Sequence, residues 1–437
     1  MSVTNTPDRP SFVKIADADI NGIFPSGLEY NPPARGMWNI VHTGMLVPEA
    51  HEIFACAQGC LRGVILTAAE MFELDRLSWI SVSEEDMFDG TLESGIIDGV
   101  CEIIEKLGHR PPVVLLYLSC IHLFAGVDFD VIIGELSAKY PDIHFVDCYM
   151  APTMRTTVSP VMKMSSQIYG ALQPLPLDKK CVAIVGNDRA TDEDSELVRI
   201  IRENGFTHYD IAYCKTFEEY LQMAKAAVNI SYIPTGVLAG DELKERFGGE
   251  HIHIPFSCDF DTIEENYKTL CDTLGVDMPD FEEDKKAALQ SLKNARAIIG
   301  DTPIAIDYTA VTRPFELARL LCEQGFDVRY VVADSAGEEP QAFEWLKINR
   351  PELLIYSPVN VNMLEMPDEP HEDILAIGQK AAYYFASDRF VNIIVNGGYY
   401  GFSGIRKIAD LMTDAYLNKK DRAQLLRLKG MGCASCL

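Results

Sequence analysis

Residues 181–186, which read CVAIVG, are the apolar run that decides the fold. A short β-branched run of this kind predicts a buried strand, and the helical periodicity of Asp192–Asn204 follows it. The same alternation continues, with strands expected at 209–213, 227–232 and 252–254 and helices at 217–225 and 259–274. Strands that alternate with helices are typical of parallel sheets. The middle of the chain is therefore expected to be a doubly wound α/β unit.

The alternation restarts at Asp301 and predicts a second unit of the same kind. Its expected strands are PIAIDY (303–308), FDVRYVVAD (326–334), ELLIYS (352–357) and FVNIIVN (390–396). Helices are expected at 314–323, around Phe343 and around Ile377. Residues 279–294 have no strand character and predict a linker helix between the two units.

A third unit precedes these two. It holds expected helices at 61–74 and 96–107, an expected strand at 113–118, and a proline-containing end that suits a boundary. We therefore expect four parts: an N-terminal α/β domain (1–177), a central domain with the linker helix (178–296), a C-terminal domain (297–420) and a tail (421–437).

Composition narrows the class of protein. The chain has 437 residues, of which 48% are hydrophobic and 24% charged, as in ordinary globular proteins. Its 38 basic and 65 acidic residues give 38 − 65 = −27, so nucleic acid and anionic membranes are poor partners. The longest apolar run, 111–126, is too short to cross a bilayer. The first ten residues lack a secretion signal, and the twelve cysteines form no disulfide framework, so we expect a cytoplasmic protein.

Cys56 and Cys60 lie in the segment HEIFACAQGCLRGV, at the expected start of a helix. Gly59 permits a tight turn before that helix. The N–H groups and the dipole at a helix start favour thiolate, the form of cysteine that binds iron or zinc. The alternative is that both are small buried apolar residues, and this local pattern leaves it open.

Cys120 follows the expected strand VVLLYLS, and ligands of open α/β sheets bind outside the carboxyl ends of strands. The cysteines that fall inside apolar strand or helix patterns are interpreted as core residues; they are Cys148, Cys181, Cys214, Cys271 and Cys322. His42 and His51 flank the Cys60 segment and could reach a cluster there. His251 and His253 are interpreted as strand residues with a packing role, and no Ser/His/Asp arrangement is visible.

A glycine turn, VNGGYYGFSG, joins the expected strand at 391–395 to a helix. Glycines let a ligand approach the backbone, and a helix start offers N–H groups to an anion. The residues assigned to a substrate pocket are Gly397, Gly398, Tyr399, Tyr400 and Gly401. A plain strand-to-helix turn explains the glycines equally well. No Gly-Lys-Ser/Thr loop occurs in the sequence, so we expect no nucleotide on this chain.

The C-terminal tail, GMGCASCL, contains Cys433 and Cys436 at a spacing that suits metal or a redox disulfide. A zinc site needs four ligands, and no second pair is visible in the sequence. A flexible tail with incidental thiols is the favoured interpretation.

These segments together resemble the nitrogenase component 1 superfamily. The resemblance runs from about residue 31 to 418 and rests on six segments in order: NPPARGMW, ACAQGCLRGV, SEEDMFDGTLESGI, LSC, AKAAVNISYIP and GGYYGFSGIRKIADLM. It implies a fold of three Rossmann-like doubly wound parallel-sheet domains.

The resemblance also implies an iron–sulfur cluster at a subunit interface. Cys60 and Cys120 match two of the family's cluster ligands, and Cys56 stands one helical turn away as a substitute. The family's most N-terminal ligand is missing, because residues 35–37 read Arg-Gly-Met. A [4Fe–4S] cluster shared between two chains is therefore expected.

The large catalytic cofactor of the family is not expected here. Asn229, Ser231 and Tyr232 stand where its cysteine ligand would be, and Asn396 and Gly397 stand where its histidine would be. Amide, hydroxyl and glycine do not replace thiolate and imidazole on iron. A small organic substrate or tetrapyrrole is expected instead.

The implied partners are an ATP-hydrolysing iron–sulfur reductase and an identical or homologous component 1 subunit, in a dimer or heterotetramer. A non-catalytic scaffold for metallocofactor assembly is the main alternative function. A binding protein for a cobalt or iron chelate, with no redox role, is a third.

Overall fold

The computed structural model describes residues 11–24, 40–150, 158–358, 360–368 and 372–423. The chain divides into two compact units. One comprises 38–190 and 201–255, and the other comprises 191–200, 256 onward and the described residues before 38. Helix α8 (Glu196–Glu203) spans the point where the chain leaves one unit for the other.

The unit that begins at residue 38 contains two parallel four-stranded sheets. The first has the order β3-β2-β4-β5, with all neighbouring pairs parallel. Its strands are β2 (Ala50–Ala57), β3 (Leu77–Val82), β4 (Val113–Ser119) and β5 (His144–Met150). Its helices are α1 (Ile40–Met45), α2 (Gln58–Glu70), α3 (Glu84–Phe88), α4 (Leu92–Lys106), α5 (Cys120–Ala125), α6 (Phe129–Lys139) and α7 (Pro160–Gln167).

The second sheet of this unit has the order β7-β6-β8-β9 and is also parallel throughout. It is built from β6 (Asp178–Ile184), β7 (Thr207–Asp210), β8 (Ala226–Ser231) and β9 (Glu250–His253), with helices α9 (Phe217–Leu221) and α10 (Gly236–Phe247). The predicted strand at 181–186 is confirmed as β6, which begins three residues earlier.

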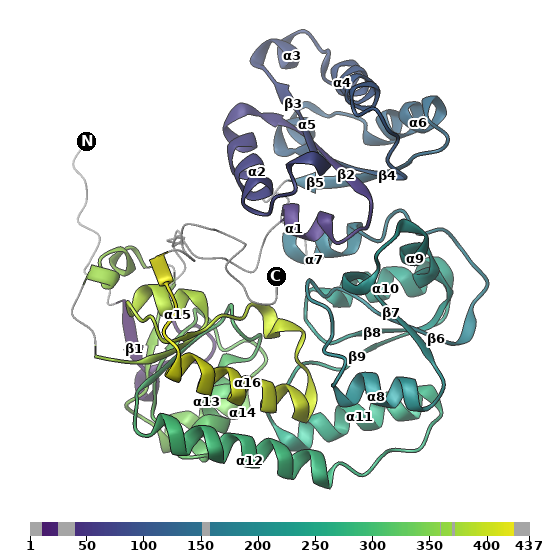
Figure 1. Ribbon diagram of the computed structural model, residues 1–437. Helices are drawn as coiled ribbons and strands as arrows, with labels where there is room; N and C mark the ends of the chain where they lie inside the picture. The colour runs from purple at the N-terminus through teal and green to yellow at the C-terminus, as the bar shows by residue number, and fades with distance from the viewer. Residues whose placement is uncertain (1–10, 25–39, 151–157, 359, 369–371, 424–437) are drawn as a thin grey trace, which may run out of the picture. The chain divides into compact units, whose positions relative to one another are not determined.

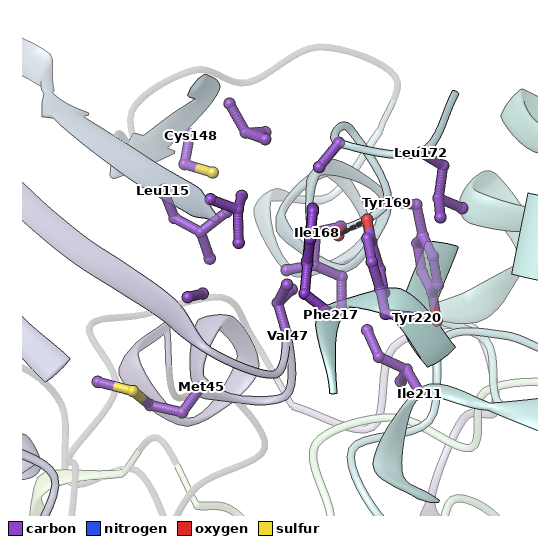
Figure 2. Packing of buried hydrophobic residues seen from close by; sticks show 14 of the residues in the cluster. Met45, Val47, Leu115, Cys148, Ile168, Tyr169, Leu172, Ile211, Phe217 and Tyr220 are labelled. Atoms are coloured by element: carbon purple, nitrogen blue, oxygen red, sulfur yellow. Dashed lines mark hydrogen bonds between the residues drawn. The ribbon is translucent and has the colours of Figure 1, made fainter. Parts of the chain in front are cut away.

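One hydrophobic core joins residues of both sheets in this unit (Figure 2). Phe217 and Tyr220, on adjacent turns of α9, stack with ring centroids 5.4 Å apart. The Tyr220 hydroxyl donates a 2.8 Å hydrogen bond to the carbonyl of Ile168, which satisfies the polar end of this buried ring. This hydrogen bond links α9 to the end of α7 within the core.

The other unit contains a six-stranded sheet with the order β1-β12-β11-β10-β13-β14. Its strands are β1 (Phe12–Lys14), β10 (Ile304–Asp307), β11 (Val328–Val332), β12 (Leu354–Tyr356), β13 (Leu375–Ile377) and β14 (Phe390–Val391). Its helices are α11 (Phe260–Leu274), α12 (Glu282–Ile299), α13 (Pro314–Glu323), α14 (Pro340–Asn349), α15 (Gln379–Tyr384) and α16 (Gly401–Leu417). The predicted linker helix is α12.

Strand β1 pairs antiparallel with β12, and Figure 1 shows it, in purple, beside the green strands of this sheet. Phe12 faces Tyr356 across the pair, and their rings lie 5.2 Å apart. The earliest described residues thus belong to the C-terminal sheet, although the sequence places residues 1–177 in an N-terminal domain. The domain boundaries stay a prediction.

Two predicted elements of the C-terminal sheet have other bounds in the structure. The helix expected around Ile377 is instead strand β13, and α15 begins only at Gln379. Gly378 makes the change of direction, with φ 110°, and the Asp307 carboxylate accepts a hydrogen bond from the N–H of Ala381. The buried run after Phe390 forms only two residues of strand, because the backbone turns at Val395, where φ is 47°.

The predicted fold class is confirmed, since strands that are parallel to their neighbours, except at the β1–β12 pair, alternate with helices along the chain. Among the described residues, no helix combines the length and the apolar character that a membrane crossing requires.

Candidate functional site

Three cysteines gather where two neighbouring strands end. Ala55 of β2 pairs with Leu118 of β4, so Cys56, the next-to-last residue of β2, and Cys120, which follows β4, lie at adjacent carboxyl ends. Cys56 is thus a strand residue, and the expectation that it stands one helical turn from Cys60 is wrong, because α2 begins only at Gln58. Cys120 is the first residue of α5, and Cys60 is the third residue of α2. The two parallel strands therefore bring together residues that are 64 and 60 positions apart (120 − 56 and 120 − 60).

The three thiols differ in exposure. Cys60 is exposed, Cys120 is partly exposed, and Cys56 is buried. Burial, together with the nearby thiols of Cys60 and Cys120, raises the pKa of the Cys56 thiol to about 12. Cys56 therefore stays protonated at neutral pH unless a bound cation displaces its proton. Cys60 is the thiol that solvent or a partner reaches first.

The donor set suits iron–sulfur chemistry but does not complete a site. Thiolate is the ligand that iron–sulfur clusters take, and four are needed. Within the ranges that the structure describes, no group of three or more Cys, His, Asp or Glu side chains is arranged to hold a metal ion. The three cysteines fit a cluster only if a second chain adds ligands.

The flanking histidines are engaged elsewhere. Nε2 of His42 lies 3.1 Å from the carbonyl oxygen of Asp188 and 3.0 Å from the Arg189 guanidinium. Nε2 of His51 lies 2.8 Å from the Ser78 hydroxyl, and burial lowers the pKa of His51 to about 4. His42 and His51 thus have protein partners in place of a cluster.

Large apolar side chains are exposed on the helices that follow β3 and β4. Phe88, the last residue of α3, is 87% exposed. Phe124, one turn after Cys120 on α5, is 77% exposed. Because β3 and β4 flank β2, both rings follow strands at the edge of the sheet where the cysteines lie.

The Glu196 carboxylate, which belongs to the same unit, binds the helix that follows the glycine turn. Glu196 accepts hydrogen bonds from the Ser403 N–H (3.0 Å) and from the hydroxyls of Ser403 (3.2 Å) and Tyr267 (2.9 Å). Its carboxylate therefore lies at the start of α16, where the sequence suggested an anionic ligand. Of the five pocket residues, Gly397, Gly398, Tyr400 and Gly401 are buried, and only Tyr399 is partly exposed.

A chain of four polar side chains, missed in the sequence, lies at the carboxyl edge of the β7-β6-β8-β9 sheet. The Ser231 hydroxyl lies 2.9 Å from Nε2 of His251 and 2.9 Å from Nδ1 of His253. Nδ1 of His251 lies 2.7 Å from the Asp241 carboxylate. The only sequence signal was that His251 and His253 occupy alternate positions, so they share one face of a strand.

Other cysteine predictions have mixed outcomes. Cys148, Cys181 and Cys271 are buried as predicted, whereas Cys214 and Cys322 are only partly buried. Cys433, Cys436 and the segment 35–37 lie outside the described residues.

The chain matches the family of nitrogenase component 1 type oxidoreductases over residues 41–417. A solved structure of nitrogenase Cp1 at pH 6.5 is similar, with 15% identity, a TM-score of 0.67 and coverage of 90% of this chain and 94% of that chain. Nitrogenase Cp1 at pH 5 is similar with 13% identity, a TM-score of 0.60 and 93% coverage of each chain. A search of curated proteins found no match.

Proposed function

Because the chain belongs to the nitrogenase component 1 type oxidoreductase family, we propose that it is one subunit of a cytoplasmic two-component reductase. In this proposal, an ATP-hydrolysing iron–sulfur reductase supplies electrons, and this chain passes them to a small organic or tetrapyrrole substrate. The observation that carries the proposal is the gathering of Cys56, Cys60 and Cys120 at the ends of β2 and β4.

Cys60 and Cys120 would hold the cluster, and Cys56 would be a third ligand from this chain. A second component 1 chain, identical or homologous, would supply the rest of a [4Fe–4S] set. Such a cluster supplies one-electron transfer when it is bound. Cys433 and Cys436 remain a weaker candidate metal pair.

The exposed rings of Phe88 and Phe124 support a shared cluster. A partner that covers them would bury apolar surface, which is worth about 25 cal/mol per Å². The same contact would remove water from the thiols beside them. Burial of aromatic residues and completion of the ligand set would then occur in one association step.

The large nitrogenase-type cofactor is not part of this proposal. Ser231 already lies within hydrogen-bond distance of two imidazoles, and the Asn396 amide oxygen accepts a 2.8 Å bond from the N–H of Thr312. Ser231 and Asn396 thus already have partners within the protein at hydrogen-bond distance. Tyr399, the partly exposed residue of the glycine turn, is the one we propose faces the substrate. Molybdenum or vanadium in the purified subunit would contradict this assignment.

The test of the cluster is iron content. Replacement of both Cys60 and Cys120 by alanine should remove most of the iron and the visible absorbance, because alanine offers no ligand. Cys56→Ala tests the third ligand by itself. Cys271→Ala and Cys322→Ala are matched controls that should keep full iron. Full iron in the Cys60→Ala/Cys120→Ala variant would reject the cluster.

A cofactor-assembly scaffold of the same fold would also hold iron. The two functions separate when the reduced protein is mixed with substrate, partner reductase and ATP. A reductase is reoxidised by its substrate and turns over repeatedly, whereas a scaffold stays reduced. Co-purification from the native cell would identify the partner chain for this experiment.

A further inference from the structure

We propose that Asp241, His251, Ser231 and His253 form a proton relay into the carboxyl edge of the β7-β6-β8-β9 sheet. This inference rests on the proposed reductase function, because a reduction that adds electrons to an organic substrate also needs protons. The three links of the relay measure 2.7, 2.9 and 2.9 Å, all of which are hydrogen-bond distances.

The relay runs from solvent through a buried middle to the edge of the sheet. The Asp241 side chain is 60% exposed, the His251 side chain is only 5% exposed, and Ser231 has no exposed surface, whereas His253 at the far end is partly exposed. Ser231 and His253 are the last residues of β8 and β9 and face each other in the parallel pair. Ligands of such sheets bind outside these strand ends. The far end of the relay therefore lies at the edge where ligands of such sheets bind.

Every member of the relay can both give and take a proton. In one inward transfer, the Asp241 carboxyl gives its proton to Nδ1 of His251, and Nε2 of His251 gives one to the Ser231 oxygen. The Ser231 hydroxyl gives its own proton to Nδ1 of His253, and the His253 ring would then give one to a bound ligand. One proton leaves solvent and one arrives at the ligand. The electrons come from the reductase.

The backbone leaves room for this arrangement at Gly240. A Cβ atom at that position would overlap the ring of His251. Because Gly240 has no side chain, α10 can lie against the His251 ring and carry Asp241 next to Nδ1. The relay thus depends on a close approach of helix and strand.

Hydrolysis by a serine nucleophile is the other chemistry that such a constellation suggests. A nucleophile needs access to its substrate, and Ser231 is fully buried. The Ser231 oxygen also has an imidazole on each of two sides. Both observations favour proton transfer through Ser231 over nucleophilic attack by Ser231.

The experiment measures electron and proton uptake separately in the purified, iron-loaded protein. An electrode with a viologen mediator, whose one-electron couple binds no proton, would reduce the protein in weak buffer, with the charge passed reporting electrons and an indicator dye reporting protons. General acid–base groups contribute about 10²–10⁴-fold to proton transfer. Ser231→Ala should therefore slow proton uptake about 100-fold and leave electron uptake unchanged. Ser231→Thr, which keeps a hydroxyl, should restore the rate.

Ser78→Ala is the matched control, because Ser78 also binds a histidine ring but lies in the other sheet of the unit. It should leave proton uptake unchanged. Equal proton uptake in wild type and Ser231→Ala, or no proton uptake by the reduced wild type, would overturn the relay.

A second measurement keeps the relay testable if the protein takes up no electrons and the proposed function fails. In ¹⁵N-histidine NMR, Ser231→Ala should shift the Nε2 resonance of His251 and the Nδ1 resonance of His253 together, because each nitrogen lies 2.9 Å from the Ser231 oxygen. Unchanged resonances of either ring in Ser231→Ala would reject the relay. Labelling of Ser231 by a fluorophosphonate would also reject it and would favour a hydrolase.

Discussion

Glu52 lies in β2 with its carboxyl group fully buried. Neither oxygen has a hydrogen-bond partner among the residues that the structure describes. Helix α1 lies so close that a Cβ atom at Gly44 would overlap the Glu52 carboxyl oxygen. Burial raises the pKa of Glu52 well above its usual range, even though the nearby Arg76 opposes the shift. The folded protein therefore favours the neutral acid.

The raised pKa of Glu52 predicts that the folded protein loses stability as pH rises. Because the folded pKa lies above the unfolded value of 4.5, the contribution of Glu52 is present below pH 4.5 and is lost as pH rises through the folded pKa. Glu52→Gln cannot ionise, so its melting temperature should fall less than that of the wild type over this range. Thermal melts of both proteins from pH 5 to 9 measure the difference, with the exposed Glu203→Gln as control. Parallel curves for wild type and Glu52→Gln would contradict the prediction.

For single residues, the sequence predicts a position well when that position depends on one strand and the helix after it. The places of Cys60 and Cys120 near the start of a helix were predicted in this way. The contact of Ser231 with His251 depends on the register between β8 and β9, which apolar periodicity does not specify. The closure of the glycine turn by Glu196 depends on packing between distant segments, and it was missed for the same reason.

Among the elements, the glycine turn before α16 has the strictest backbone requirement. Gly401 has φ 72°, and a Cβ atom there would overlap the Tyr267 hydroxyl and the Glu196 carboxylate. The left-handed conformation alone costs an L-residue about 1–2 kcal/mol, and the overlap adds to that cost. The start of α16 is thus built for glycine.

Gly401→Ala should therefore lower the free energy of unfolding by more than about 2 kcal/mol. Gly63→Ala is the control, because Gly63 lies inside α2 with nothing within 4 Å of its Cβ position. Alanine in a helix interior is favoured over glycine by about 0.5–1 kcal/mol, so the control should be neutral or stabilising. Urea unfolding followed by circular dichroism measures both. An unchanged midpoint for Gly401→Ala would show that the turn adapts.

Elements with clear start and stop signals were predicted well. Helix α13 matches its expected range of 314–323, where proline marks the first turn. The run around Ile377 was misread because three buried apolar residues fit a strand and a helix equally well. Strand β1 gave no signal, because three residues are too few for a period.

The net charge of −27 is a property of the whole molecule, and it predicts how the rate of association with a partner depends on salt. An acidic surface steers a basic docking face, and salt screens that attraction. Association with the proposed reductase should slow as salt rises from about 0.1 M to about 1 M, where the Debye length falls from about 10 Å to about 3 Å. Stopped-flow or surface-binding kinetics measure the rate. An association rate independent of salt would mean that the charge serves solubility only.

The pairing of β1 with β12 has a consequence for how the protein is made. Lys14 and Glu352, which form an ion pair across it, are separated by 338 positions. At about 5–20 residues per second, a ribosome needs about 17–68 s to travel that distance. Until then β1 lacks the strand with which it pairs, so it can join the sheet only after residue 356 has been synthesised. Strand β1 is thus made before β10 and β11 of its sheet but takes its place after them.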